Sequence, residues 1–364
     1  MRIDWTMWIP PILAMALVLA VMPAFLPFLR KLKFGQTIYD LGPQAHKAKQ
    51  GTPNMGGIVT ASATVLALLV YCIILAVRNS AAFALQSALW PLLIITVGCT
   101  ALFGFPDDYI KDVKKDHEGL KPRQKLVGQM VVGLLFSLYC YFTLGGDVWI
   151  PFTHHSWNLG VFYIPIMTVL VMFITNSANL QDGVDGILSS VTIVGMIAFG
   201  IIALTIGETA TNSTAGETLA ARLFPGQADT PWFAVTATLC FALAGASAGF
   251  LFFNHHPAKI FMGDTGSMFI GGAFVGVSML MKCEFLLIPI CFTCIMSSVS
   301  VMMQTTYFKY TKKKYGEGRR IFRMSPLHHH FELCGMKENQ IVLMYTAVTL
   351  VLSAIAVWSV VSVF

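Results

Sequence analysis

Five aspartates occur in short polar motifs, and each motif adjoins a long apolar stretch. They are Asp107 and Asp108 in Phe-Pro-Asp-Asp-Tyr, Asp182 and Asp185 in Asn-Leu-Gln-Asp-Gly-Val-Asp-Gly, and Asp264 in Met-Gly-Asp-Thr-Gly-Ser. Carboxylates at the edge of an apolar layer are costly unless they are paired or hydrated, so they are candidates for function. Helix N-capping is the structural alternative for single residues among them, but capping alone does not account for all of them together.

The adjacent pair Asp107 and Asp108 favours a divalent cation. Two carboxylates about 4 Å apart repel each other by about 4 kcal/mol at an effective dielectric of about 20, and a cation relieves that repulsion. Oxygen ligands from carboxylates suit Mg²⁺, which keeps several waters and commonly bridges substrate phosphates. We therefore predict that Asp107, Asp108 and Asp264 hold Mg²⁺.

Glycine-rich turns lie beside these carboxylates. Gly-Thr-Pro-Asn-Met-Gly-Gly (51–57), Asp-Gly-Val-Asp-Gly (182–186) and Gly-Asp-Thr-Gly-Ser (263–267) each precede or open a predicted helix. Glycine lets backbone amides approach a ligand, and a helix N-terminus attracts phosphate. With the nearby cations, these turns predict a site for a pyrophosphate and a metal together. The cations are Lys49, Lys111, Lys121 and Lys125.

Histidine and cysteine offer other possible metal ligands. The consecutive residues His328, His329 and His330 cannot all point one way on a helix, and no cysteine is spaced to complete a closed zinc site. We expect them to contact a phosphate or a sugar, and we expect His255 and His256 to be ordinary interface residues. The Cys-x-x-Cys pair at 291 and 294 lies in an apolar run, which favours buried thiols over a redox or metal pair.

The elements that must position these residues are membrane-spanning helices. The chain is 56% hydrophobic and only 12% charged, whereas an ordinary soluble domain is about 25% charged. A helix needs about 20 apolar residues to cross the bilayer. Ten stretches meet that length approximately: 6–29, 57–77, 85–105, 125–144, 160–178, 187–206, 232–253, 266–282, 285–305 and 339–361. The prediction is an all-α polytopic membrane protein, with 1–364 as one integral membrane domain.

Charge indicates how these helices are oriented. Alternate loops contain nearly all of the lysines and arginines; the exceptions are Arg2, Arg78, Arg222 and Lys282. Basic residues in short loops mark the cytoplasmic face. We therefore predict both termini on the periplasmic or extracellular side, and the polar motifs on the cytoplasmic side. The predicted cytoplasmic loops are about 30–56, 106–124, 179–186, 254–265 and 306–338.

The motifs, in this order and over essentially the whole chain, resemble the polyprenyl-phosphate N-acetylhexosamine-1-phosphate transferase superfamily. Asp107-Asp108-Tyr109 is similar to its Asp-Asp motif, and the segment 179–186 is similar to its Asn-x-x-Asp-Gly-x-Asp-Gly motif. The segments 327–332 and 51–57 resemble those of the branch that uses a muramoyl-pentapeptide nucleotide.

The resemblance implies a Mg²⁺-dependent enzyme of the bacterial inner (plasma) membrane. It would transfer phospho-MurNAc-pentapeptide from UDP-MurNAc-pentapeptide to undecaprenyl phosphate, giving lipid I and UMP in peptidoglycan synthesis. Asp107 as general base and Asp108 as covalent nucleophile are both open as mechanisms. The residues implied in catalysis are Asp107, Asp108, Asp264 and His328. Those implied in substrate binding are Lys49, Lys111, Lys121, Lys125, Asn179, Asp182, Asp185, Asn254, Phe261, Gln304, His328, His329 and His330.

Three alternatives stay open from the sequence. A relative that uses UDP-GlcNAc would not need the pentapeptide, and the triple-histidine segment argues against it. A transporter for an anion or nucleotide would place polar groups near the middle of the bilayer, on broken helices in two repeated halves; here the charges gather on one face. An inactive lipid-binding scaffold leaves the aspartates unexplained. Membrane lipid is an expected partner and nucleic acid is not, and a homodimer is compatible with the apolar helix faces.

Overall fold

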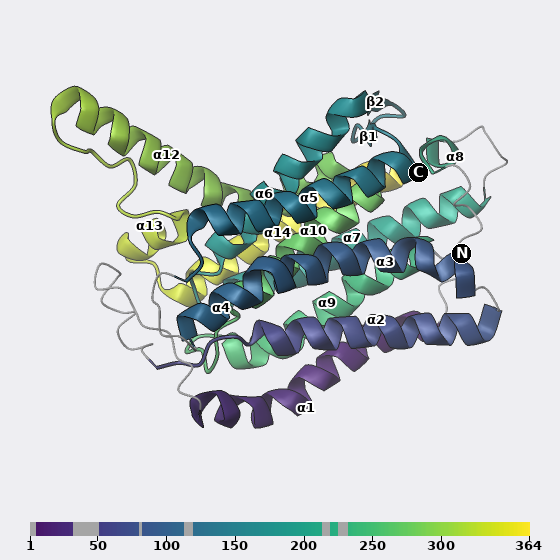
Figure 1. Cartoon of the computed structure of the whole chain (residues 1–364), viewed down its shortest axis with the longest axis horizontal. Helices are drawn as coiled ribbons and strands as arrows, with labels where there is room; N and C mark the ends of the chain where they lie inside the picture. Colours follow the sequence, from purple (N-terminus) through teal and green to yellow (C-terminus); the bar gives the residue numbers. More distant parts are fainter. Residues whose placement is uncertain (1–4, 32–50, 80–81, 113–118, 213–218, 225–231) are drawn as a thin grey trace.

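A computed structural model describes residues 5–31, 51–79, 82–112, 119–212, 219–224 and 232–364 of the chain, and Figure 1 shows a bundle of long helices. The first half contains η1 (Trp5–Trp8), α1 (Ile9–Lys31), α2 (Gly57–Asn79), α3 (Ala82–Cys99), η3 (Thr100–Gly104), α4 (Phe105–Asp112), α5 (Pro122–Leu144), η4 (Gly160–Phe162) and α6 (Tyr163–Gln181). The second half contains α7 (Ile187–Asn212), α8 (Leu219–Leu223), α9 (Trp232–Asn254), α10 (Gly263–Leu280), η5 (Glu284–Leu286), α11 (Leu287–Ile290), α12 (Phe292–Tyr315), α13 (Leu327–Leu333) and α14 (Glu338–Val361). Two short strands, β1 (Asp147–Trp149) and β2 (Ser156–Asn158), pair antiparallel between α5 and α6.

The protein is an all-α polytopic membrane protein. In the described part of the chain, eight helices are long and apolar enough to cross a membrane, and the bent pair Glu284–Ile290 and Phe292–Tyr315 makes nine if it counts as one span. The predicted stretch 266–282 corresponds to α10, which is not among these nine although it runs through the interior of the bundle. By this criterion of length and hydropathy, the described residues therefore contain fewer membrane spans than the ten predicted.

Helix α10 is the central element. It is buried along almost its whole length, and it packs against α2, α3 and α6. A Cβ atom added at Gly271 would lie 2.6 Å from Thr175 Cα, and one added at Gly276 would lie 2.6 Å from Ile95 Cγ2. Small residues at these positions let neighbouring helices approach closely, as membrane bundles require. Close packing on several sides therefore holds the start of α10, where Asp264 lies.

The Asp-Asp motif lies on a helix rather than at the start of a loop. Helix α3 continues through the π-helical turn η3 into α4, and Asp107 and Asp108 lie in the first turn of α4. The predicted loop 106–124 therefore begins inside a helix. Since successive residues on a helix point about 100° apart, the two carboxylates face different neighbours.

The predicted span 285–305 is not one straight helix. Helices α11 and α12 meet at Cys291 with a bend of 82°. Pro289 has no amide hydrogen to donate within the helix, which favours a break there. Cys291 and Cys294 therefore lie at a helix break and not in mid-helix, but both are buried free thiols, as are five others of the eight cysteines. In Figure 1, α12 leaves the bundle and projects beyond it.

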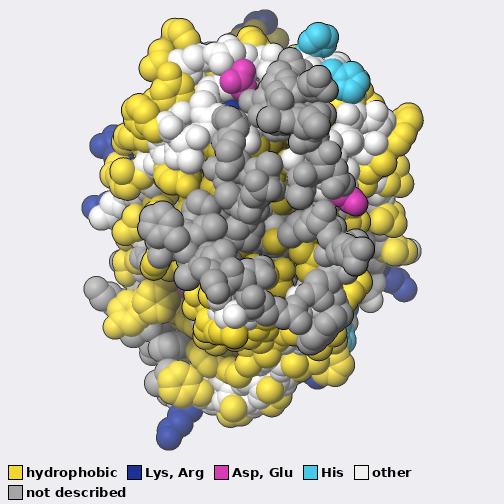
Figure 2. Space-filling model, turned by 90° about the vertical axis from the view of Figure 1, so that its right-hand side faces the viewer, with side chains coloured by type: hydrophobic (Ala, Val, Ile, Leu, Met, Phe, Trp, Pro, Cys, Tyr) yellow, Lys and Arg dark blue, Asp and Glu magenta, His cyan; other side chains and the backbone are white. Residues whose placement is uncertain are grey.

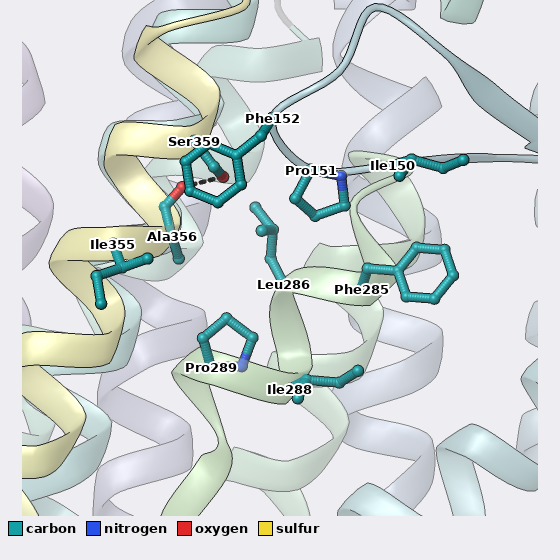
Figure 3. Close-up of a pocket in the computed structure, with 10 residues that line it drawn as sticks. All are labelled: Ile150, Pro151, Phe152, Phe285, Leu286, Ile288, Pro289, Ile355, Ala356 and Ser359. Atoms are coloured by element: carbon teal, nitrogen blue, oxygen red, sulfur yellow. Dashed lines mark hydrogen bonds between the residues drawn. The ribbon is translucent and has the colours of Figure 1, made fainter.

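The two ends of the bundle differ in character. In Figure 1, α1 begins and α14 ends at the right-hand end, whereas α4 and α13 lie at the left-hand end. Figure 2 shows the right-hand end, where most of the described side chains are hydrophobic. A hollow of about 300 Å³ lies on this side, between the β1–β2 connection, η5 with α11, and α14 (Figure 3). The lining is apolar apart from Ser359, whose hydroxyl donates to Ala356 O at 2.7 Å. Helix α4, which contains Asp107 and Asp108, lies at the other end.

Candidate active site

Two carboxylates and two lysines form one ion-pair cluster where α4, α5 and α10 meet. Lys125 Nζ lies 2.7 Å from Asp107 Oδ2 and 2.7 Å from Asp264 Oδ2. Lys111 Nζ lies 2.6 Å from Asp107 Oδ2 and 3.5 Å from Asp264 Oδ2. Buried charges are tolerated when they are paired and hydrogen-bonded, and here two negative groups face two positive ones. The structure thus brings together four of the predicted site residues.

The donor set of this cluster fits Mg²⁺. The Lys125 ammonium group lies between the Oδ2 atoms of the two aspartates, which marks a position where both carboxylates can face one cation. The other oxygens are held in place: Asp107 Oδ1 accepts the Leu120 amide at 2.8 Å, and Asp264 Oδ1 accepts the Asn179 side-chain amide at 2.8 Å. Mg²⁺ is usually held by one or two carboxylates together with waters and phosphate oxygens. Asp107 and Asp264 meet that description.

Asp108 faces away from this cluster and into the start of α10. Its Oδ1 accepts the Asp264 amide at 3.0 Å, and its Oδ2 accepts the Thr265 amide at 2.7 Å and the Thr265 hydroxyl at 2.5 Å. Asn54 Nδ2 lies 3.4 Å from Oδ1. The side chain is 1% exposed. Asp108 therefore caps α10 from another helix, which stabilises the free amides at that terminus.

The glycine-rich segment 51–57 lies against the segment that leads into α10. Phe261 N donates to Pro53 O at 2.8 Å, and Gly56 N donates back to Phe261 O at 2.9 Å. A Cβ added at Gly57 would lie 2.2 Å from the Gly266 backbone, so only glycine allows α2 and α10 to start this close together. Phe261 is partly exposed beside these turns. The segment thus builds one wall next to Asp264.

The end of α6 supplies polar side chains to the same place. Asn179 Nδ2 donates to Asp264 Oδ1 and, at 3.0 Å, to Ser267 Oγ. Asp182 follows directly in the turn between α6 and α7, where it is half-buried. Burial raises the pKa of the Asp182 carboxyl well above its ordinary value, and the nearby negative charges of Asp264 and Asp108 raise it further. Asp182 thus lies within electrostatic range of the ion-pair cluster.

Asn254 and Asp185 connect loops to one another. Asn254 Oδ1 accepts the Gly186 amide at 3.0 Å, and its Nδ2 donates to Ile260 O at 2.9 Å. Asp185 Oδ2 contacts the His256 ring and accepts the Ala258 amide, both at 3.1 Å. These contacts tie the turn 182–186 to the loop after α9, so the structure gives both residues a bracing position.

The three consecutive histidines point to three different surroundings. His328 is fully buried, and a Cβ added at Gly183 would lie 2.5 Å from its Nε2 atom, so it packs on the turn that contains Asp182. His329 Nδ1 lies 3.1 Å from Glu332 Oε2. His330 Nδ1 accepts the Arg323 amide at 3.1 Å. A Cβ added at Gly183 would also lie 3.2 Å from His329 Nε2, so His328 and His329 both lie close to the turn between α6 and α7.

The remaining predicted residues lie apart from the cluster or outside the described chain. Gln304 Oε1 accepts the amides of Ile321 and Phe322, each at 3.0 Å, and its Nε2 donates to Phe322 O at 3.0 Å, so it holds the loop after α12. Lys121 is exposed at the start of α5. Lys49 lies outside the described residues.

Thr265, Ser267 and the Leu120 amide contact the predicted site residues, but the sequence did not identify them individually. Thr265 and Ser267 contact the aspartate and asparagine side chains, but a hydroxyl residue near a helix start is equally common as a cap. The Leu120 amide could not be found from residue type at all, because any residue but proline provides one. Only the spatial arrangement identifies these three.

Comparison with known proteins gives a consistent result. Residues 89–282 match the model of the family described as glycosyl transferase family 4. A phospho-N-acetylmuramoyl-pentapeptide-transferase from Listeria welshimeri is 39% identical over 347 residues, which cover 94% of this chain and 95% of that protein. Proteins of the same name from Bacillus thuringiensis and Bacillus cereus are each 40% identical over 343 residues, or 93% of either chain.

Proposed function

Because this chain belongs to the phospho-N-acetylmuramoyl-pentapeptide transferase family, we propose that it transfers phospho-MurNAc-pentapeptide from UDP-MurNAc-pentapeptide to undecaprenyl phosphate. The products are lipid I and UMP, in the first membrane step of peptidoglycan synthesis. The observation that carries this proposal is the similarity to these transferases over 94% of the chain. The cluster of Asp107, Asp264, Lys111 and Lys125 supports the proposal, because its two lysines and its carboxylates suit the binding of two phosphates with a metal ion.

The proposed reaction exchanges one phosphoanhydride for another. An oxygen of the lipid phosphate forms a bond to the phosphorus that carries the sugar. The bond from that phosphorus to the bridging oxygen breaks, and UMP leaves with the oxygen. Both reactants are anions, so positioning and charge neutralisation account for most of the expected rate enhancement.

We propose Asp264 and Asp107 as the ligands of Mg²⁺. When bound, the ion neutralises charge on the pyrophosphate. Lys125 and Lys111 lie within 3.5 Å of the same carboxylate oxygens, so their ammonium groups can move to phosphate oxygens when substrate arrives. Asp107 is then placed to orient the lipid phosphate or to take its proton.

Asp108 is poorly suited to act as the nucleophile of the covalent route. A nucleophilic oxygen must reach phosphorus, whereas both Asp108 oxygens accept hydrogen bonds from the start of α10. Single-turnover labelling with a radioactive sugar nucleotide and no lipid tests this. Label on the protein that added lipid phosphate releases would support the covalent route, and its absence by rapid quench would support direct attack.

For the nucleoside end we propose Phe261, which offers a ring face, together with Asn179 and Asp182. Lys49 is proposed for a contact with an anionic group of the substrate. For the sugar and its phosphate we propose His328 and His329, which lie beside the turn that contains Asp182. His330, Asn254, Asp185 and Gln304 support the loops around the substrate. Unchanged nucleotide affinity after Asp182→Asn would remove Asp182 from this set.

We further propose ten spans, with both termini outside and the site facing the cytoplasm, where the nucleotide is available. Cys334 offers a direct test, because it is the one exposed cysteine of the eight, all of which lie in the described chain. A membrane-impermeant maleimide should label Cys334 in inside-out vesicles and not in right-side-out ones. The reverse pattern would invert the topology. A homodimer stays a prediction.

The experiment that tests the function measures UMP release by the purified protein in mild detergent. UDP-MurNAc-pentapeptide is supplied with and without undecaprenyl phosphate, Mg²⁺ and the Asp264→Ala change, and UDP-GlcNAc serves as the control nucleotide. Release that needs lipid and metal, is lost in Asp264→Ala and is absent with UDP-GlcNAc supports both the reaction and the substrate. Release from UDP-GlcNAc instead favours the related GlcNAc-phosphate transfer, and no release from folded protein favours a transporter or an inactive lipid-binding scaffold.

A further inference from the structure

Three ionisable side chains from three separate segments converge at the cytoplasmic loops. Asp185 comes from the turn between α6 and α7, His256 from the loop after α9, and Glu338 from the first turn of α14. His256 Nδ1 lies 3.1 Å from Asp185 Oδ2 and 3.5 Å from Glu338 Oε2. The three potential ligand atoms all lie within 4.8 Å of one another. No other group of three such residues in the described part of the chain meets this condition.

Burial makes this convergence unusual. Asp185 is 4% exposed and Glu338 is 8% exposed, so both carboxylates are largely removed from water. The His256 ring is 39% exposed. An imidazole Nδ1 atom carries at most one hydrogen, yet this one lies within 3.5 Å of two carboxylate oxygens. Carboxylate oxygens and an imidazole nitrogen are ligand atoms that divalent metal ions bind in proteins.

The distances match those around a bound ion. Ligand atoms about 2.1 Å from a tetrahedral metal are about 3.4 Å from one another. The nitrogen-to-oxygen distances of 3.1 and 3.5 Å bracket that value. The donor set of two carboxylate oxygens and one imidazole nitrogen suits a first-row transition metal better than Mg²⁺, which prefers oxygen alone. The exposed side of His256 leaves room for water to complete the coordination.

We propose that Asp185, His256 and Glu338 form a second metal site, which takes a divalent transition-metal ion such as Zn²⁺ or Co²⁺. The site is separate from the one formed by Asp107 and Asp264. An ion here connects the turn 182–186, the loop after α9 and the start of α14. The Asp185 amide already donates to Glu338 Oε2 at 3.4 Å, so the ion strengthens a junction that the chain itself forms. Its role is to brace the loops, and it takes no part in group transfer.

The test is Co²⁺ binding to the purified full-length protein, followed by the visible absorption of the bound ion. All proteins carry Cys334→Ser, because the exposed thiol lies 3.8 Å from His330 Nε2 and would bind the probe. Excess Mg²⁺ occupies the carboxylates of the ion-pair cluster. We expect one tightly bound Co²⁺ per chain, and a midpoint of thermal unfolding that rises by several degrees with the ion.

Variants then locate the ion. His256→Gln should weaken Co²⁺ binding by at least about tenfold and abolish the thermal shift, and Glu338→Gln should do the same. His255→Gln is the matched control, since it changes the adjacent exposed histidine, and it should bind Co²⁺ as the parent does. Asp264→Ala should also retain the ion. Absence of Co²⁺ from the parent protein, or equal binding by His256→Gln, overturns the proposal. If Glu338→Gln does not fold, the comparison of His256→Gln with the parent protein still tests the proposal, because His256 is exposed.

Discussion

Asp108 accepts two hydrogen bonds from Thr265, one from the amide at 2.7 Å and one from the hydroxyl at 2.5 Å. The two residues are 157 positions apart in the chain, so this contact joins α4 to the start of α10. Helix α10 also contains Asp264, and the position of that carboxylate therefore depends on Asp108. Asp108, which its sequence motif suggests as a catalytic residue, thus also positions Asp264, which we propose as a ligand of the metal.

Asp108→Ala should destabilise the protein more than Asp107→Ala does. It removes hydrogen bonds to a buried carboxylate and leaves the amides at the start of α10 without that acceptor, at a cost of about 2–4 kcal/mol. Thermal unfolding in detergent compares the two variants, with Mg²⁺ affinity as a second measurement. An Asp108→Ala protein with the parent midpoint and no turnover would show a chemical role instead.

Lys125→Gln should separate metal binding from substrate binding. In the structure its ammonium group pairs with both carboxylates, so it competes with a divalent ion for them. Without that competitor, the Mg²⁺ concentration that gives half-maximal activity should fall, while the KM for the nucleotide rises because a cation near the phosphates is lost. Steady-state kinetics over a Mg²⁺ series measure both values. A higher Mg²⁺ requirement in this variant would contradict the proposed arrangement.

Asp182→Asn should stabilise the metal-free protein increasingly as the pH rises. The folded-state pKa of Asp182 lies above the unfolded value, so the folded protein holds the proton more tightly. The stability that this group contributes is then fully present below the unfolded pKa, near 3.9, and is lost as the pH rises through the folded pKa. Asparagine stays neutral throughout. The effect is measured by the thermal unfolding midpoints of the parent and of Asp182→Asn in EDTA, at values between about pH 5 and pH 9. A difference between the two proteins that does not change with pH would refute the prediction.

Gly57→Ala should loosen the contact between α2 and α10. The added methyl group would lie 2.2 Å from the Gly266 backbone, so the helices must separate, at a cost of about 1–3 kcal/mol or more. Gly98→Ala is the matched control, because its methyl group would meet Val132 at an ordinary 3.5 Å. That change should be neutral, or stabilise by about 0.5–1 kcal/mol. Equal thermal unfolding midpoints for the two variants would show that the close approach of α2 and α10 does not contribute to stability.

Most of the architecture could be predicted from the sequence. Apolar stretches long enough to cross a bilayer are a direct consequence of the need to bury every backbone polar group inside a helix, so length and hydropathy predicted nearly all of the long helices. The break at Cys291 was missed, because a hydropathy pattern does not record whether a helix bends at Pro289. The stretch 266–282 also predicted the central α10, although this glycine-rich helix is not among those that meet the criterion for a membrane span.

The sequence by itself also determined which residue types gather around the loops: aspartates, lysines and glycine-rich turns, with the superfamily motifs among them. What it could not separate is the roles of neighbours. Asp107 and Asp108 are chemically identical, but the helix points one toward Lys111 and Lys125 and the other toward Thr265. The junction of Asp185, His256 and Glu338 was equally invisible, since His256 was expected to be an ordinary interface residue. Distances between segments far apart in the chain decide such contacts, and only the packed helices set those distances.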